Sequence, residues 1–419
     1  MRQWLFSLSQ AGRQLWLRVA AYSVLGLVTA LVAVVFRRWV PEDLALKIGT
    51  DAVDQVLSIL ASSMLAVATF SLATLVTAYT AVAALATPRA AKLLVSDGRG
   101  QGSLATFVGA FIYAVVGIFA LRTGYYGAQG RVILFFVTVV VLMLVVTALI
   151  RWIAQLSLLG QVDEAIDRVK NATEAAFAAR RATEARPSDI EPAAGVAVDA
   201  DTTGYVLSLH LEALEKAACD LGVTILVEAM PGSFVHAAQP LLRFAGRSNL
   251  TTREVARLRH AFILGERRTF DQDPRFGLVV LGQIAAKALS PGVNDPGTAI
   301  DVIATGVGVL SRWVRAAPPP DNRIEFPHLR FPALEPVELL DDLFTPIATY
   351  GAGDAIVAAR LQQAFAALAA LNEPAMSEAA RVQSALALER ALATLELDHD
   401  RERVRRAAAT VKSHGARSD

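Results

Sequence analysis

The chain has 419 residues, of which 54% are hydrophobic and only 19% are charged, a balance that argues against a protein that is soluble throughout. The formal net charge of +1 provides no bulk field for nucleic acid, so no nucleic-acid partner is expected. Cys219 is the single cysteine, which excludes an intrachain disulfide and any metal site that needs several cysteines.

Charge-free apolar runs account for the hydrophobicity of the first 150 residues. The runs are Val19–Phe36, Gln55–Pro88, Gly100–Leu121 and Val132–Ile150. Each has about 18 residues or more, enough for a helix to cross a hydrocarbon layer of roughly 30 Å. The first run begins late for a cleaved signal peptide and ends at Arg37-Arg38, so we interpret it as an anchor. Residues 1–150 are therefore predicted to be a four-span transmembrane domain.

The distribution of basic residues predicts the orientation of this domain. Four spans place both termini on one side of the membrane, and basic residues are enriched on the cytoplasmic side. The terminal side carries nine (Arg2, Arg13, Arg18, Arg89, Lys92, Arg99, Arg151, Arg168 and Lys170) and the opposite side five (Arg37, Arg38, Lys47, Arg122 and Arg131). We therefore expect the termini and the 151–419 domain to be cytoplasmic.

The second span carries small and hydroxyl side chains along one helical face. As one helix, Gln55–Pro88 would be roughly 50 Å long, which exceeds the hydrocarbon thickness. The stripe fits close packing between helices, and equally a helix that lines a water-filled path in an oligomer. The apolar cores of the four spans hold no Asp, Glu, Lys, Arg or His, so a proton relay is not expected. The candidate packing or pore residues are Ser58, Ser62, Thr69, Thr77 and Thr80.

Residues 151–419 predict a mainly helical α+β domain with a small β module. Arg151–Ala185 is expected to continue span four as a helical extension over 151–186, and Pro187–Thr203 to be a loop. The β module, 204–246, contains alternating short strands and one helix. Its strands are expected at Gly204–His210, Val223–Glu228, Phe234–Val235 and Pro240–Phe244, and its helix at Leu211–Asp220.

A helical subdomain is predicted over 251–316, followed by a proline-rich connector and C-terminal helices over 317–419. Thr251 or Thr252 is expected to cap a helix that reaches Phe262 and Ile263. Further helices are predicted at Phe276–Leu289 and Thr298–Val314, extended pieces at Arg323–Phe326 and Leu329–Phe331, and helices from about Val337 onwards.

Two blocks of this region, RTFDQDPRFG (268–277) and PGVNDPGT (291–298), place an aspartate directly before a proline. Such an aspartate can accept a backbone N–H as a helix N-cap, and proline at the first helical position loses no hydrogen bond. The remaining polar residues exceed what two caps need. They suit Arg–carboxylate pairs between helices or an oxygen-coordinated ligand site. The candidate set is Arg268, Asp271, Asp273, Arg275, Asn294 and Asp295, with the two loops about 20 Å apart at opposite ends of one helix.

Motifs for common chemistries are absent from the sequence. The six histidines show no H-x-x-x-H spacing, and neither G-x-x-x-x-G-K-[ST] nor G-x-S-x-G occurs. The sequence therefore assigns no catalytic residue, no metal ligand and no cofactor, and a non-enzymatic role is favoured.

The two aspartate-proline blocks resemble the signature of bacterial predicted membrane proteins known as domain of unknown function 2254. Ala105–Tyr113, Leu121–Gly124, Gly204–Val206 and Pro231–Val235 fit the same family. In the turn after Pro231, Ser233 and Ala237-Ala238 stand where an acid and a glycine are expected. The resemblance implies a bacterial inner-membrane protein and implies no particular activity.

The leading hypothesis is a multi-pass membrane protein that forms homo-oligomers in the lipid bilayer, with a channel-like or transport-related role and a cytoplasmic regulatory domain. One alternative is a membrane-anchored enzyme that uses Asp271, Asp273 and Asp295 with a divalent cation. The other is a membrane scaffold or sensor with neither flux nor turnover.

Overall fold

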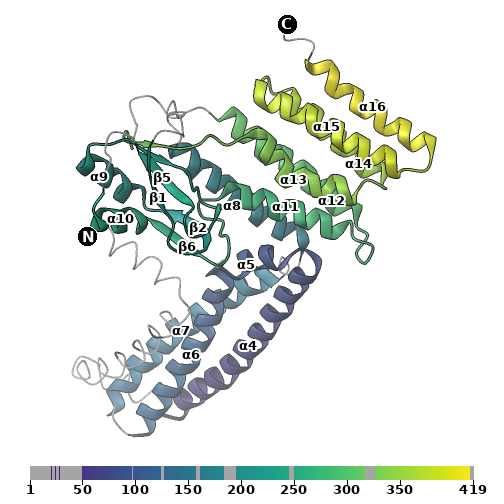
Figure 1. The fold of residues 1–419 in the computed structure, drawn as a ribbon. Coiled ribbons are helices and arrows are strands. Elements are labelled where there is room, and N and C mark those ends of the chain that lie inside the picture. Colours follow the sequence, from purple (N-terminus) through teal and green to yellow (C-terminus); the bar gives the residue numbers. More distant parts are fainter. Residues whose placement is uncertain are drawn as a thin grey trace. The chain divides into compact units, whose positions relative to one another are not determined.

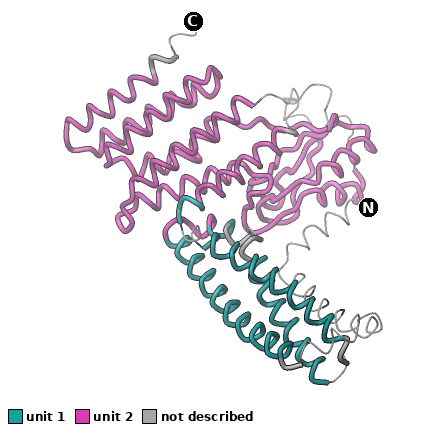
Figure 2. The backbone as a smooth tube through the Cα atoms, turned by 180° about the vertical axis from the view of Figure 1, so that it is seen from behind, with its two compact units in different colours: residues 1–84, 91–164 teal, residues 85–90, 165–419 magenta. Residues whose placement is uncertain are grey.

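The computed structural model describes residues 20, 24, 28, 50–96, 98–123, 127–156, 161–183, 195–244, 250–316 and 326–415. Most of the described chain is helical (Figure 1). It divides into two compact units, residues 1–84 with 91–164, and residues 85–90 with 165–419 (Figure 2).

The first unit contains three helices that are long and apolar enough to cross a membrane. They are α4 (Thr50–Leu85), α6 (Gly98–Arg122) and α7 (Gly127–Leu156), and the short helix α5 (Pro88–Ser96) follows α4. These helices match the second, third and fourth predicted spans. The first predicted span, Val19–Phe36, lies almost wholly outside the described residues, so the count of four is not confirmed.

One face of α4 forms the core of this unit together with α6 and α7. Leu57 and Leu60 are buried with Phe107 of α6 and Leu134 of α7. The buried hydroxyl groups of Tyr113 and Thr138 lie 3.1 Å apart and hydrogen-bond to one another, which satisfies both within the apolar interior. The three spans therefore pack as a bundle with a defined inside.

The predicted helix Arg151–Ala185 is wrong as a single element. Helix α7 ends at Leu156, Gln161 is not helical, and α8 runs from Val162 to Thr183. The apolar spacing that predicted one helix is shared by the end of α7 and by α8, so the pattern alone does not reveal the break between them.

The β module contains two small sheets with a common core. The first has the order β1 (Val196–Asp199), β5 (Pro240–Phe244), β3 (Ile225–Val227), β7 (Leu329–Arg330), and only its β3–β7 pair is parallel. The second has the antiparallel order β4 (Phe234–Val235), β2 (Gly204–Leu209), β6 (Phe262–Gly265). Val206, Leu214, Ile225 and Leu242 are fully buried between these sheets and α9 (Leu211–Leu221).

Two local predictions in this module are corrected by strand pairing. Val196–Asp199 lies inside the predicted loop 187–203 but forms β1, because it pairs with β5. Thr251 caps α10 (Thr252–Arg259) in a capping box, as predicted, but the helix does not reach Phe262. Phe262 instead pairs with Leu209 in the second sheet, where a long-range strand partner outweighs the helical spacing. The extended piece Leu329–Phe331 is confirmed as β7, whereas most of Arg323–Phe326 lies outside the described residues.

The remaining helices form a bundle: α11 (Pro274–Ala288), α12 (Pro296–Arg315), α13 (Pro336–Tyr350), α14 (Ala355–Ala369), α15 (Pro374–Thr394) and α16 (Asp398–Gly415). Helix α11 contacts α12 and α13, and α14 contacts α15 and α16 (Figure 1). Two glycines let α11 approach its neighbours closely. A Cβ atom on Gly282 would lie 2.7 Å from the carbonyl oxygen of Leu343 in α13, and one on Gly277 would overlap Thr173 of α8.

Candidate functional site

Asp273 begins helix α11. Its Oδ1 accepts the backbone N–H of Phe276 at 3.0 Å, and Pro274 occupies the first turn of the helix. The helix-start interpretation of this aspartate is therefore confirmed.

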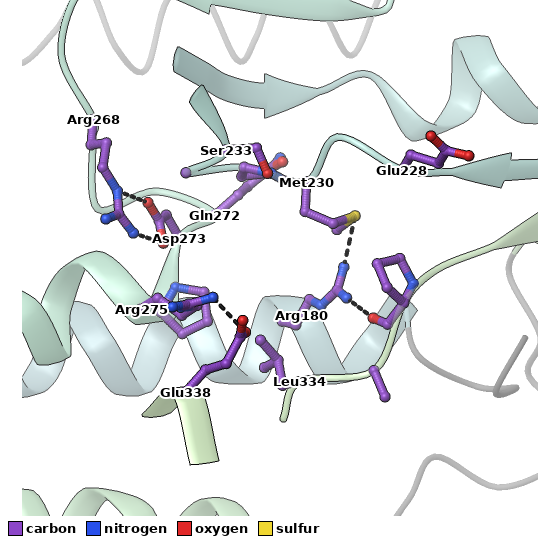
Figure 3. A pocket seen from close by; sticks show the side chains of 15 residues that line it. Arg180, Glu228, Met230, Ser233, Arg268, Gln272, Asp273, Arg275, Leu334 and Glu338 are labelled. Carbon is purple, nitrogen blue, oxygen red and sulfur yellow. Dashed lines mark hydrogen bonds and ion pairs between the residues drawn. The ribbon is translucent and has the colours of Figure 1, made fainter. Parts of the chain in front are cut away.

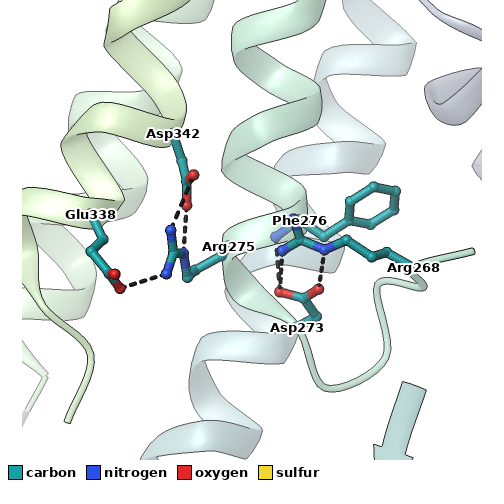
Figure 4. A network of polar contacts seen from close by, with 6 residues as sticks. All are labelled: Arg268, Asp273, Arg275, Phe276, Glu338 and Asp342. Carbon is teal, nitrogen blue, oxygen red and sulfur yellow. Dashed lines mark hydrogen bonds and ion pairs between the residues drawn. The ribbon is translucent and has the colours of Figure 1, made fainter. Parts of the chain in front are cut away.

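Arg268 binds the same carboxylate in two parallel hydrogen bonds (Figure 4). Its Nε lies 2.7 Å from Oδ2 of Asp273 and its Nη2 lies 2.9 Å from Oδ1. The guanidinium group also lies over the ring of Phe276, 5.2 Å from its centroid. This bidentate geometry fixes the direction of both side chains.

The carboxylate of Asp273 is almost completely enclosed. Its side chain is 3% exposed, and a methyl group on Gly232 would overlap it. Gly232 has a φ of +94°, so the turn after Met230 can lie against the carboxylate only because this residue has no side chain. Burial raises the pKa of Asp273 above its ordinary value, and the hydrogen bond and charge of Arg268 oppose that rise.

Arg275 points the other way, toward helix α13 (Figure 4). Its Nε lies 2.6 Å from Oδ2 of Asp342, and a second nitrogen binds Glu338. Burial lowers the pKa of Arg275, but the hydrogen bond and charge of Asp342 outweigh that effect, so the pKa is raised. The Arg–carboxylate pairs thus connect the first turn of α11 to α13.

A cavity of about 320 Å³ opens beside Asp273 (Figure 3). Arg180 of α8, buried to 6% exposure, reaches it and donates to Sδ of Met230 at 3.1 Å and to the carbonyl of Pro332. Gln272 Oε1 accepts the backbone N–H of Leu209 at 3.0 Å. The volume is at the lower end of small-molecule sites, and about half of the lining residues are charged or polar. The labelled residues around it are Arg180, Glu228, Met230, Ser233, Arg268, Gln272, Asp273, Arg275, Leu334 and Glu338.

Asp295 begins helix α12 at a different place. Its Oδ1 accepts the N–H of Thr298 at 3.1 Å, and its Oδ2 accepts the Thr298 hydroxyl at 2.6 Å. These two hydrogen bonds favour the charged form and lower the pKa of Asp295. Asn294 has a φ of +50°, a left-handed conformation that asparagine tolerates, and it closes the tight turn between α11 and α12.

The six predicted site residues are therefore divided between two places. Arg268, Asp273 and Arg275 line the cavity, and Asp271 is exposed nearby in the chain. Asn294 and Asp295 follow the last turn of α11, where the Asp295 N–H donates to the carbonyl of Ala288. Because α11 has 15 residues, the two aspartates lie about 20 Å apart in one chain.

Sequence reasoning missed several lining residues, above all Arg180, Gln272 and Glu338. The available signals were weak: Arg180 is one of two basic residues in the last turn of α8, and Glu338 lies four residues before Asp342 on α13. Neither signal names a partner far away in the chain, so only the fold shows that these residues share a cavity.

The hydroxyl stripe of α4 lies on the face opposite the unit's core. Ser62, Thr69, Thr77 and Thr80 are exposed, and Ser58 is half-buried. The four exposed hydroxyls each donate to a carbonyl of their own helix, as Thr69 does to Leu65 at 3.0 Å. In the described part of the chain, α4 packs against α6 and α7 through its other face, Leu57 and Leu60 among others. The stripe is thus available to lipid, to water or to another helix.

Comparison with known proteins relates the chain to a group whose function is unknown. A sequence model for a family described as predicted membrane protein (DUF2254) matches residues 12–367. Uncharacterized proteins of Mycobacterium bovis and of Mycobacterium tuberculosis strain H37Rv are each 30% identical over 284 residues, covering 63% of this chain and 53% of theirs. The chain thus spans about half the length of the curated relatives it matches. No solved structure matches the chain significantly.

Proposed function

Because the chain belongs to the family of predicted membrane proteins DUF2254, as its aspartate-proline blocks indicated, we propose a bacterial inner-membrane protein that forms channel-like oligomers. Copies of the chain assemble through the hydroxyl face of α4, and residues 151–419 act as a cytoplasmic regulatory domain. The observation that carries this proposal is the exposed hydroxyl stripe on a helix long enough to span a bilayer.

Large apolar side chains border the hydroxyl stripe on the exposed surface of α4. Leu65 and Val76 lie one turn before Thr69 and Thr80, along the edge of the stripe. Phe70 lies about 100° around the helix from Thr69. These three side chains are 49–64% exposed, and they suit contact with lipid. The stripe at Thr69, Thr77 and Thr80 has short side chains that let another helix approach closely. Each hydroxyl oxygen, having donated its proton to a carbonyl, can still accept a hydrogen bond from water or from a neighbour. A second copy of the chain is the partner that satisfies this face, and water along an oligomer axis gives the channel-like role.

Cross-linking in native membranes tests the oligomer. The chain has one cysteine, so Cys219→Ser provides a cysteine-free background into which Thr69→Cys is introduced. Oxidation is expected to produce covalent dimers. Phe70→Cys is the matched control, one residue away at the same depth but about 100° around the helix. Equal cross-linking at the two positions, or none at Thr69→Cys, contradicts the interface.

Flux into proteoliposomes tests the channel-like role separately. Thr69→Trp is expected to reduce passage of small ions at least about tenfold, because a bulky ring fills a path lined by hydroxyls and methyls. Phe70→Trp, facing lipid, is expected to leave the flux unchanged. If the vesicles show no flux under any ion gradient while the Thr69→Cys cross-link forms, the channel-like role is contradicted. The protein would then be an oligomeric scaffold or sensor.

Cys219 also reports on orientation, since it is exposed. A membrane-impermeant maleimide is expected to label it only after cells are opened. Labelling in intact cells would place the second unit outside and overturn the cytoplasmic assignment.

The membrane-anchored, metal-dependent enzyme has less support from the geometry. Both oxygens of Asp273 already accept hydrogen bonds from Arg268, and Asp295 lies at the other end of α11. Mg²⁺ binding to the full-length protein that is abolished by Asp273→Asn would restore this alternative.

A further inference from the structure

A second cluster of titratable side chains lies where helix α9 contacts strand β7. Glu215 and Cys219 are four residues apart and share one face of α9, while His328 directly precedes β7. One carboxylate oxygen, the thiol sulfur and the imidazole Nδ1 all lie within 4.8 Å of one another. The cluster thus joins two segments that are 109 residues apart in the chain.

The three donor atoms converge on one point. Nδ1 of His328 lies 2.6 Å from Oε1 of Glu215 and 3.3 Å from Sγ of Cys219, and Sγ lies 3.7 Å from Oε1. The backbone N–H of His328 also donates to Oε2 of Glu215 at 3.2 Å, which holds the carboxylate in place. Glu215 and His328 are partly buried and Cys219 is exposed, so one side of the cluster is open to solvent.

This arrangement differs from that of a nucleophilic triad. In a triad, one imidazole nitrogen faces the nucleophile and the other faces the orienting carboxylate. Here the thiol and the carboxylate both face Nδ1. Ligands that surround one ion share this convergent geometry, and the carboxylate would not orient the ring for proton abstraction from the thiol.

We propose that Glu215, Cys219 and His328 bind a divalent transition-metal ion, with Zn²⁺ the best match, and leave a fourth position for water. Thiolate, imidazole and carboxylate are the three ligand types that Zn²⁺ takes in proteins, whereas Mg²⁺ and Ca²⁺ prefer oxygen alone. On binding, the thiol proton leaves to solvent, and the N–H proton of a neutral His328 ring is transferred through solvent from Nδ1 to Nε2, which frees Nδ1 to bind the ion.

The observed separations are close to those of a tetrahedral site. Zinc–ligand distances of about 2.0–2.3 Å place tetrahedral donor atoms about 3.3–3.8 Å apart. The Cys219–His328 and Cys219–Glu215 separations of 3.3 and 3.7 Å lie within that range. Only the Glu215–His328 pair, at 2.6 Å, has to open, by about 0.8 Å, when an ion replaces the shared proton. A small rotation of the glutamate side chain supplies that movement.

Calorimetric titration of full-length, tag-free protein in detergent with Zn²⁺ tests the site. We expect one high-affinity site per chain. Cys219→Ser and His328→Gln are each expected to weaken it more than about 100-fold, beyond the 10–100-fold typical of outer-shell partners. Glu212→Gln on α9 and His260→Gln, both exposed residues outside the cluster, are matched controls that keep the wild-type affinity. Undiminished affinity in Cys219→Ser, or no zinc binding by the wild type, overturns the proposal.

Alkylation of the unaltered chain provides a second measurement that does not depend on a variant folding correctly. Because Cys219 is the only cysteine, iodoacetamide reports on it alone. Saturating Zn²⁺ is expected to slow alkylation at least about tenfold by holding the thiolate, and His328→Gln is expected to remove that protection. An alkylation rate that Zn²⁺ does not change contradicts the site.

Discussion

Asp273 and Asp295 begin two helices with the same Asp-Pro pair and nearly the same backbone angles, φ −120° and ψ 86° against φ −117° and ψ 83°. Each accepts the N–H three residues further on. Asp273, however, is 2% exposed and its carboxylate accepts a hydrogen bond from Arg268. Asp295 is exposed, and its carboxylate accepts a hydrogen bond from the hydroxyl of Thr298. Identical local chemistry therefore produces an ordinary helix start in one place and the wall of a polar cavity in the other.

The difference comes from what lies around each cap. The turn at Gly232 and the bidentate Arg268 enclose Asp273, so burial dominates and its pKa is raised. Nothing comparable among the described residues encloses Asp295, so its hydrogen bonds to Thr298 dominate and its pKa is lowered. A motif can thus be identified from sequence while its function depends on its surroundings.

The largest expected contrast is between Asp273→Ala and Asp295→Ala. Asp273→Ala removes a cap and leaves the largely buried Arg268 without its carboxylate, so the free energy of unfolding is expected to fall by about 3 kcal/mol. Asp295→Ala removes an exposed cap and is expected to cost about 1 kcal/mol. Denaturant unfolding of the full-length protein in detergent measures both. Equal losses would show that enclosure of Asp273 adds no energy.

The glycine beside each carboxylate gives a contrast of intermediate size. Gly232→Ala places a methyl group into Asp273 at a positive φ, and is expected to cost about 2 kcal/mol. Gly297→Ala meets only Asp295 Oδ1 at 3.2 Å, in an exposed first turn, and alanine favours the helix. It is expected to change stability by less than about 1 kcal/mol, toward greater stability. Thermal unfolding of the two variants measures the contrast, and a loss at Gly297 as large as that at Gly232 contradicts it.

The smallest contrast is the sign of the pH dependence. The pKa of Asp273 is raised in the folded protein, so folding favours the protonated carboxyl. The free energy of unfolding of wild type is therefore expected to fall, relative to that of Asp273→Asn, as the pH rises from the ordinary aspartate pKa of about 3.9 toward the folded pKa. The folded pKa of Asp295 is lowered, so wild type keeps its advantage over Asp295→Asn above about pH 3.9 and loses it as pH falls through the folded pKa. Unfolding free energies measured from about pH 3 to pH 7 reveal whether the slopes have opposite signs.

The sequence was sufficient where the deciding interactions are local. Apolar length identifies α4, α6 and α7, and the aspartate-proline pairs locate the starts of α11 and α12 to within about two residues. Arg268 and Asp273 are five residues apart, so their pairing was also within reach of local reasoning.

Interactions between distant segments could not be predicted in the same way. The apolar spacing of Leu258, Phe262 and Ile263 favours one helix, but Leu209, more than 50 residues earlier, draws Phe262 into a sheet. The cavity needs Arg180 from α8, the turn at Gly232 and the segment at Pro332, and the cluster at Cys219 needs His328. The spacing of residues within one segment does not indicate these long-range contacts, because the packing of the whole second unit brings the segments together.

Helix α11 has glycine at the two points where it crosses its neighbours, Gly277 against α8 and Gly282 against the backbone of α13. Because no side chain separates the helices at these two points, they are in close contact there, and one helix cannot slide past another without a clash. The three helices are therefore expected to move as one rigid unit. Arg275 lies at one end of α11 in this unit, and the turn at Asn294 lies at the other end. A displacement imposed at the cavity would be carried along the 15 residues of α11 to its far end with little loss in the intervening packing.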